Sequence, residues 1–184
     1  MYLPLAHCAI RSWRPSDAVR LAVIANDRSI WMMLRDRFPH PYSQADAEAF
    51  IAVAATEVPE CNFAITVEDI VVGSIGCIRG DDIARVSAEL GYWLGADARG
   101  RGLATVALRG FVGWLWANSD LQHLRASVFL NNPGSARVLE KGGFTLAHIA
   151  RKAAIKDGRI MDEWYYVRVR GDDPSDAREG AGET

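Results

Sequence analysis

The chain is short of the residues that mark several protein classes. Its 184 residues include only 3 cysteines and 4 histidines, and Cys8, Cys61 and Cys77 lack the C-x-x-C spacing of zinc or redox sites. We therefore expect reduced, buried thiols, as is typical of a cytoplasmic protein, and no bound metal. No apolar run approaches the roughly 20 residues that a membrane helix requires, so we expect no membrane partner.

An excess of charge of either sign is missing too. The chain has 21 Lys and Arg against 23 Asp and Glu, a formal net charge of −2 and an isoelectric point of about 6.1. Nucleic-acid-binding domains are usually basic, so no nucleic-acid partner is expected. The first residues lack a basic segment followed by an apolar core, so we expect no signal peptide and a cytoplasmic location.

What is present fits one globular domain. Hydrophobic residues make up 49% of the chain and charged residues 24%, which is ordinary for such a protein. We assign residues 1–170 to a single domain. Residues 171–184 are rich in Gly, Asp, Glu and Ala without large apolar side chains, so we expect a disordered tail there.

The first third of the chain predicts one strand and three helices. The strand covers 7–13, and Ser16 and Asp17 offer an N-cap for a helix over 17–26. A second helix over about 28–37 is broken by the prolines at 39 and 41. Ser43 caps a third helix that runs to about 55, with Asp46 at the capping-box position.

The remainder alternates between strands and helices. Strands over 61–67, 70–78 and 85–94 are separated by short turns and predict an antiparallel meander. Helical spacing of apolar residues begins at 103, a strand covers 124–129, and Asn132-Pro133 open a short helix that stops at Gly142. Strands over 144–154 and 160–169 follow. The helix between 86–94 and 124–129 makes these strands a parallel pair, so the fold class is mixed α/β (α+β).

The turn at residues 99–104 carries the first chemical signal. Gly100 and Gly102 leave the backbone bare and free to adopt positive φ, just where an apolar helix begins. The free N–H groups and dipole of a helix start attract a phosphate-type anion, and Arg99 and Arg101 add positive charge. No Lys-Ser or Lys-Thr follows the glycines, which excludes a P-loop, and the G-x-G-x-x-G of a dinucleotide-binding fold is absent.

Two blocks of sequence, in the right order, resemble one family. Arg99-x-x-Gly102-x-Ala104 resembles the acetyl-CoA signature of the GNAT N-acetyltransferase superfamily. The segment 132–144 resembles the N-x-x-S-x-x-v-l-E-K-x-G-F block of its RimJ/RimL-like branch, and the resemblance covers about residues 8–170. It implies the GNAT fold, with a mixed, mostly antiparallel central sheet flanked by helices. It also implies acetyl-CoA as cosubstrate without a metal and, since many relatives are dimers, a homodimer.

The resemblance also implies which residues hold acetyl-CoA. The pyrophosphate is expected on the backbone N–H groups of Arg99, Gly100, Arg101, Gly102, Leu103 and Ala104. Trp93 and Leu94 would lend backbone groups to the pantetheine arm, where the central strand splays from its parallel neighbour. Asn132 and Ser135, on one face of the following helix, would contact the cofactor as well. The alternatives are a core role for Trp93 and a capping role alone for Asn132.

Glu89 is the candidate general base. An alkyl ammonium with a pKa near ~10.4 must lose a proton before it can attack a thioester, and a base assists that step. Glu89 lies in the central strand, a few residues before the cofactor turn. The alternative for Glu89 is a salt bridge to one of three arginines, Arg79, Arg85 or Arg125.

Ser135 is the candidate for assisting the leaving sulfur. Many members of the family have a tyrosine four residues after the position of Ser135, and that tyrosine protonates the leaving thiolate. This chain has Leu139 there. Ser135, a water or Tyr92 must then serve instead. Because serine is a poor acid, hydrogen-bond donation by Ser135 fits better than complete proton transfer.

These features together predict an acetyl-CoA-dependent N-acetyltransferase. The acceptor would be a primary amine, either a protein N-terminal α-amino group or a small-molecule amine. No Ser-His-Asp or Cys-His arrangement is present, so we expect direct attack in a ternary complex, with proximity supplying much of the rate. The segment 28–42 would cover the acceptor, and Asp162 and Glu163 would attract a cationic amine. The alternative is a non-catalytic acyl-CoA-binding regulatory module.

Overall fold

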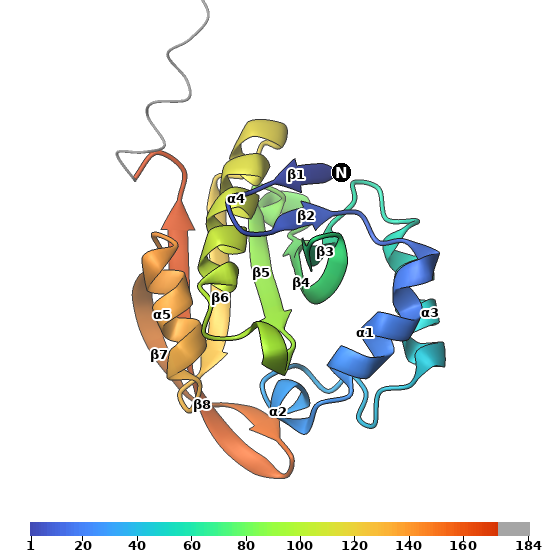
Figure 1. Cartoon of the computed structure of the whole chain (residues 1–184). Helices are drawn as coiled ribbons and strands as arrows, with labels where there is room; N and C mark the ends of the chain where they lie inside the picture. The colour runs from blue at the N-terminus through green and yellow to red at the C-terminus, as the bar shows by residue number, and fades with distance from the viewer. Residues whose placement is uncertain (173–184) are drawn as a thin grey trace, which may run out of the picture.

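A single mixed sheet runs through the computed structural model, which describes residues 1–172 (Figure 1). Its strands are β1 (Tyr2–Pro4), β2 (Ala9–Arg11), β3 (Asn62–Val67), β4 (Ile70–Arg79), β5 (Ser87–Leu94), β6 (His123–Phe129), β7 (Thr145–Lys156) and β8 (Arg159–Val169). The helices are α1 (Ala18–Ala25), α2 (Arg28–Trp31), α3 (Gln44–Ala54), α4 (Leu103–Asn118) and α5 (Pro133–Lys141). The order β1-β2-β3-β4-β5-β6-β8-β7 gives the mixed, mostly antiparallel central sheet that the sequence predicts.

Strands β5 and β6 form the parallel pair of the sheet, and α4 makes the crossover between them. Their ladder joins only residues 87–89 of β5 to 123–125 of β6. Beyond Glu89, β5 stays paired with β4 as far as Leu94, whereas β6 stays paired with β8 as far as Phe129. The two strands therefore part in the middle of the sheet, which leaves the edge of β5 without a strand partner on that side.

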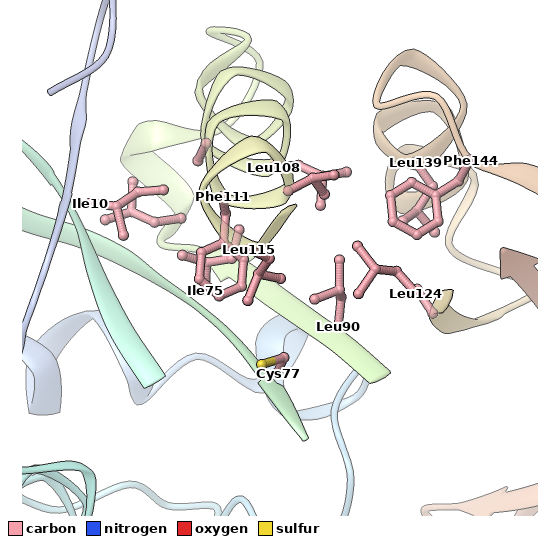
Figure 2. Close-up of a cluster of buried hydrophobic side chains, with 14 of the residues drawn as sticks. Ile10, Ile75, Cys77, Leu90, Leu108, Phe111, Leu115, Leu124, Leu139 and Phe144 are labelled. Atoms are coloured by element: carbon pink, nitrogen blue, oxygen red, sulfur yellow. The ribbon is translucent and has the colours of Figure 1, made fainter. Parts of the chain in front are cut away.

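Hydrophobic side chains cover both faces of the sheet. On one face, Leu108, Phe111 and Leu115 of α4 point at the strands, as Figure 2 shows. Leu139 of α5 lies beside Phe144 in the same core, and both are buried. The other face packs against α1 and α3. Because each helix is anchored by buried apolar groups, the loops at the carboxyl end of β5 rest on a rigid scaffold.

Local signals predict several helix starts correctly. Ser43 caps α3 by accepting from the backbone N–H of Asp46 at 3.2 Å, and Asp46 accepts in return from the Ser43 N–H at 2.8 Å. Asn132 caps α5, with Pro133 as its first residue. Asp17 does not cap α1; its carboxylate instead takes two hydrogen bonds from the buried Arg11 guanidinium, at 2.7 and 2.9 Å.

Two stretches of the chain depart from expectation. The helix predicted over 28–37 ends at Trp31, and turns follow it, in which the N–H groups of Met33 and Leu34 bond to carbonyls three residues back. The predicted strand over 7–13 is only Ala9–Arg11, and it pairs with the short strand β1, which was not predicted. The predicted tail lies outside the described residues from 173 onward.

The predicted thiols are free, with Cys8 and Cys77 buried and Cys61 partly buried. Within residues 1–172, no group of His, Cys, Asp and Glu side chains is arranged to hold a metal ion. No helix in the same part of the chain has the length and apolar character to span a membrane.

Candidate active site

The glycine turn before α4 presents a bare backbone surface. Gly100 and Gly102 have φ of 74° and 77°, a conformation that side-chain-bearing residues rarely adopt, and no atom lies within 4 Å of where their Cβ atoms would stand. Gly102 is the N-cap of α4 and supplies no side-chain cap. Among residues 1–172, no acceptor is bonded to the backbone N–H groups of 100–104. Consecutive free N–H groups at a helix start fit a pyrophosphate, as the sequence predicts.

The two arginines of this turn behave differently. Arg101 is exposed, whereas the Arg99 guanidinium is already hydrogen-bonded. Its Nε donates to the Leu94 carbonyl at 3.0 Å, and its Nη1 donates to Ser29 Oγ at 3.0 Å. Its Nη2 lies 3.4 Å from a carboxylate oxygen of Asp27, the N-cap of α2. Arg99 thus ties the cofactor turn to α2, a role that the sequence does not reveal.

Side chains alternate along β5, so its two faces carry different groups. Leu90 and Leu94 are buried in the core beneath α4, which places Tyr92 on the same face. Glu89 and Trp93 lie on the opposite face, where the Trp93 ring contacts Phe38 edge-on at 6.0 Å. The separation of β5 from β6 therefore lies between a Tyr92 side and a Glu89 side.

Tyr92 and Ser135 meet on the α5 side of this separation. The phenol oxygen of Tyr92 lies 2.9 Å from Ser135 Oγ and 3.0 Å from the Ser135 carbonyl oxygen. Burial raises the pKa of Tyr92 well above its ordinary value, and the hydrogen bond with Ser135 offsets part of that rise. The phenol therefore stays protonated at neutral pH and can donate a hydrogen bond to Ser135.

The rest of α5 explains two further features of the sequence. Asn132 Oδ1 accepts from the Ser135 N–H at 3.1 Å, so Asn132 acts as a helix cap and fixes the first turn that carries Ser135. Leu139 is fully buried in the core beneath α4. The position where the family often has tyrosine is thus a packing position here.

Hydrogen-bond alternation indicates which backbone groups of β5 face the separation from β6. The Gly95 N–H donates to the Val72 carbonyl at 2.9 Å, so alternate residues, including Trp93, direct their backbone groups toward β4. Tyr92 and Leu94 direct theirs the other way, and the Leu94 carbonyl accepts from Arg99. Of the two residues predicted to bind pantetheine, Leu94 thus offers its backbone N–H on this side, and Trp93 contributes its ring to the packing on Phe38.

A cavity of about 340 Å³ opens on the Glu89 side of the sheet. Its walls come from the loop after α2, from β5 and β6, and from the β7–β8 hairpin. They comprise Met33, Leu34, Arg35, Asp36, Glu89, Ser127, Phe129, Ala153, Ala154, Ile155, Lys156, Glu163 and Tyr165. Apolar side chains and charged or hydroxyl-bearing side chains contribute about equally, so the cavity suits a polar ligand.

Glu89 is held by two arginines in this cavity. Arg35, from the loop after α2, donates to one carboxylate oxygen, and Arg125 Nη2 on β6 lies 3.6 Å from the other. The salt bridge to Arg125 is one of the alternatives considered for Glu89, whereas Arg35 was not predicted. The other two arginines lie elsewhere: Arg79 pairs with Asp120 and Arg85 donates to the Asp82 carbonyl.

The β7–β8 hairpin lies below α2 in Figure 1 and lines the cavity together with the loop after α2. The Lys156 ammonium is buried, lies 3.9 Å above the centre of the Trp31 ring and bonds to Asp36 at 2.8 Å. At the hairpin turn, Arg28 of α2 pairs with Asp157 at 2.7 Å. Lys156 appears in the sequence as an ordinary residue beside a turn, so no local signal reveals this contact.

Asp162 on β8 and His148 on β7 do not line the cavity. Asp162 accepts from the Lys152 N–H at 2.7 Å, which supports the irregular part of β7 rather than the cavity. His148 is exposed, stacked on Tyr165 at 4.6 Å, and not a wall of the cavity. Glu163, which is expected from the sequence to attract a cationic amine, lines the cavity.

The known proteins that are similar to this chain are acetyltransferases. The model of a family described as acetyltransferase (GNAT) domain matches residues 8–145. Probable N-acetyltransferase YjcK of Bacillus subtilis is 32% identical over 106 residues, so the chain spans 59% of that relative's length and 58% of its own. Putative ribosomal N-acetyltransferase YdaF of the same species is 27% identical over 173 residues, covering 89% of this chain and 92% of the relative.

Solved structures share the fold. Mycobacterium smegmatis RimJ in complex with CoA-disulfide superimposes with a TM-score of 0.84 at 20% identity, over 94% of this chain and 88% of the other. The RimJ/RimL-like resemblance of the two sequence blocks is confirmed by these matches.

Proposed function

Because the chain belongs to the GNAT acetyltransferase family, we propose that it transfers an acetyl group from acetyl-CoA to a primary amine. One observation carries the proposal: the separation of β5 from β6 has a Tyr92 side and a Glu89 side, which we take as the donor side and the acceptor side. The donor side has the free N–H groups before α4 and the Tyr92–Ser135 pair. The acceptor side has the cavity that Glu89 lines.

The chain's own residues supply the donor site. The free N–H groups of 100–104 and the exposed Arg101 would hold the pyrophosphate. The backbone groups of Tyr92 and Leu94 would bond to the pantetheine amides as a missing strand partner would. Acetyl-CoA supplies a thioester. A neutral amine can attack the thioester carbonyl without any chemical change to the thioester beforehand.

Proton movement would use one residue on each side of the sheet. We assign Glu89 to receive the proton of the acceptor ammonium, directly or through a water, since it lines the cavity at the point where the strands part. Ser135 Oγ would donate a hydrogen bond to the leaving sulfur, and Tyr92 would hold that hydroxyl in place. Neither role requires a covalent intermediate on the enzyme.

The acceptor is proposed to be either a protein N-terminal α-amino group or a small-molecule amine. A relative named as a putative ribosomal N-acetyltransferase supports the first, and a cavity of about 340 Å³ accommodates an N-terminal residue or a small amine. The test is to offer acetyl-CoA with N-terminal peptides and small amines together and to identify acetylated products by mass spectrometry. Coenzyme A binding without any acetylated product would instead indicate a non-catalytic acyl-CoA-binding module.

A further inference from the structure

We propose that Glu163 binds the ammonium group of the acceptor, and that the acceptor is an amine without a neighbouring carboxylate, such as a peptide N-terminus or an alkyl amine. The inference rests on the proposed function and narrows its substrate class. It excludes free α-amino acids as preferred acceptors. Glu163 is thereby a binding residue of the acceptor pocket, distinct from Glu89.

Four of the five charged side chains that line the cavity form ion pairs with one another, and Glu163 is the fifth. Arg35 is bonded to Glu89, and Lys156 is bonded to Asp36 at 2.8 Å. Among the residues that the structure describes, Glu163 has neither an ion-pair partner nor a hydrogen-bond partner for its carboxylate. The residues that line the cavity therefore include two cations and three carboxylates, and Glu163 is the carboxylate without a partner.

Strand register places Glu163 on the same face of the sheet as Glu89. Glu89 lies opposite Arg125 on β6, and Phe129, four residues further along β6, lies opposite Glu163 on β8. An even separation along a strand keeps side chains on one face, and both glutamates line the cavity. A partly buried carboxylate without a partner is unfavourable, and an ammonium group would relieve that cost.

Each cation at the cavity already has a carboxylate partner on the protein. Lys156 is enclosed between Asp36 and the Trp31 ring, and its side chain is 1% exposed. Arg35 is engaged by Glu89, with Arg125 on the far oxygen. A free amino acid would bring a second carboxylate close to Glu163 and would compete with Glu89 and Asp36 for these cations, whereas an amide or alkyl group at that carbon would do neither.

The test compares alaninamide with alanine, which carry the same amine and differ in the carboxylate. Titrations of the coenzyme A-saturated protein, followed by NMR, are expected to show alaninamide binding at least about tenfold more tightly. Glu163→Gln is expected to weaken alaninamide binding by about tenfold and to leave coenzyme A affinity and thermal stability unchanged. Glu48→Gln, an exposed change on α3, is the matched control and should alter neither affinity.

Three outcomes overturn the inference: alanine binding as tightly as alaninamide, binding of neither probe, or a Glu163→Gln variant that binds both probes as the native protein does. Failure of the proposed function looks different. If alaninamide binds through Glu163 but no acetylated product forms from any amine, the function is wrong and the recognition stands. If amines are acetylated but Glu163→Gln does not change the preference between the probes, only this inference fails.

Discussion

The phenol oxygen of Tyr92 lies 2.9 Å from Ser135 Oγ and thereby joins the free edge of β5 to the first turn of α5. Ser135→Ala removes the hydroxyl proposed to stabilise the leaving sulfur. We expect kcat to fall by about tenfold to hundredfold, with a much smaller change in KM for acetyl-CoA, because the bond strengthens as charge develops on sulfur. Steady-state kinetics with both substrates varied measures this.

Tyr92→Phe should give a smaller loss of kcat in the same direction, since it leaves the serine hydroxyl but removes its partner. Ser16→Ala, an exposed change before α1, is the control. Native turnover in the Ser135→Ala variant would remove Ser135 from the reaction.

Glu89→Gln separates a base from a structural ion pair. If Glu89 takes the proton, kcat/KM for the acceptor should fall at least about tenfold, because a positioned general base contributes about 10²–10⁴-fold. The rise in activity with pH on the acidic side should also disappear. Rate profiles across pH for the native protein and the variant measure both effects.

A matched variant, Arg125→Gln, removes a charge partner of Glu89 and keeps the carboxylate. It should lower kcat/KM for the acceptor much less than Glu89→Gln does, because the proposed proton acceptor is still present. If Glu89→Gln keeps the native profile and only unfolds more easily, the glutamate is structural.

Alanine substitutions of Arg99 and Arg101 should have different effects on the KM values of the two substrates. Arg101 is exposed at the cofactor turn, so Arg101→Ala should raise KM for acetyl-CoA by several-fold and leave the acceptor KM unchanged. Arg99→Ala also releases Ser29 and Asp27 of α2, which supports the acceptor cavity, so both KM values should rise. Equal effects of the two substitutions on both substrates would show that Arg99 does not couple the two sides.

Buried phenols predict a loss of stability in alkali. Burial, with a smaller contribution from Asp46, raises the pKa of Tyr42 from 10.0 to about 12. The folded state therefore holds this proton more tightly than the unfolded chain does. Its contribution to stability is complete below pH 10 and declines as pH rises through 12.

Thermal unfolding between pH 9 and 12 should show a falling Tm that is less steep in Tyr42→Phe. Tyr2→Phe, at an exposed position, should leave the slope unchanged. An identical slope in the Tyr42→Phe and native proteins would contradict the assigned cause.

Much of the fold can be predicted from the sequence because it depends on interactions between residues that are close together in the chain. The Ser43–Asp46 capping box and the Asn132–Pro133 start of α5 depend on residues within one turn of each other, and both are found as predicted. The glycine turn can be predicted for the same reason, because the positive φ angles of Gly100 and Gly102 depend on these residues themselves.

Contacts between distant segments explain the failures. The helix predicted over 28–37 stops at Trp31, whose ring lies beneath Lys156, a residue 125 positions later in the chain. Arg35 lies in the loop after the helix, and its side chain donates a hydrogen bond to Glu89 on β5. Neither partner is identifiable from spacing, so the acceptor cavity was predicted only as a region, with Glu163 among its candidates.

Acetyl transfer itself is tested most directly by incubating the protein with acetyl-CoA and a mixture of N-terminal peptides and small amines, then analysing the products by mass spectrometry. The account predicts acetylated amine, formed in step with free coenzyme A, and strongly reduced in the Ser135→Ala variant. Tight coenzyme A binding with no acetylated amine from any class of acceptor would contradict it.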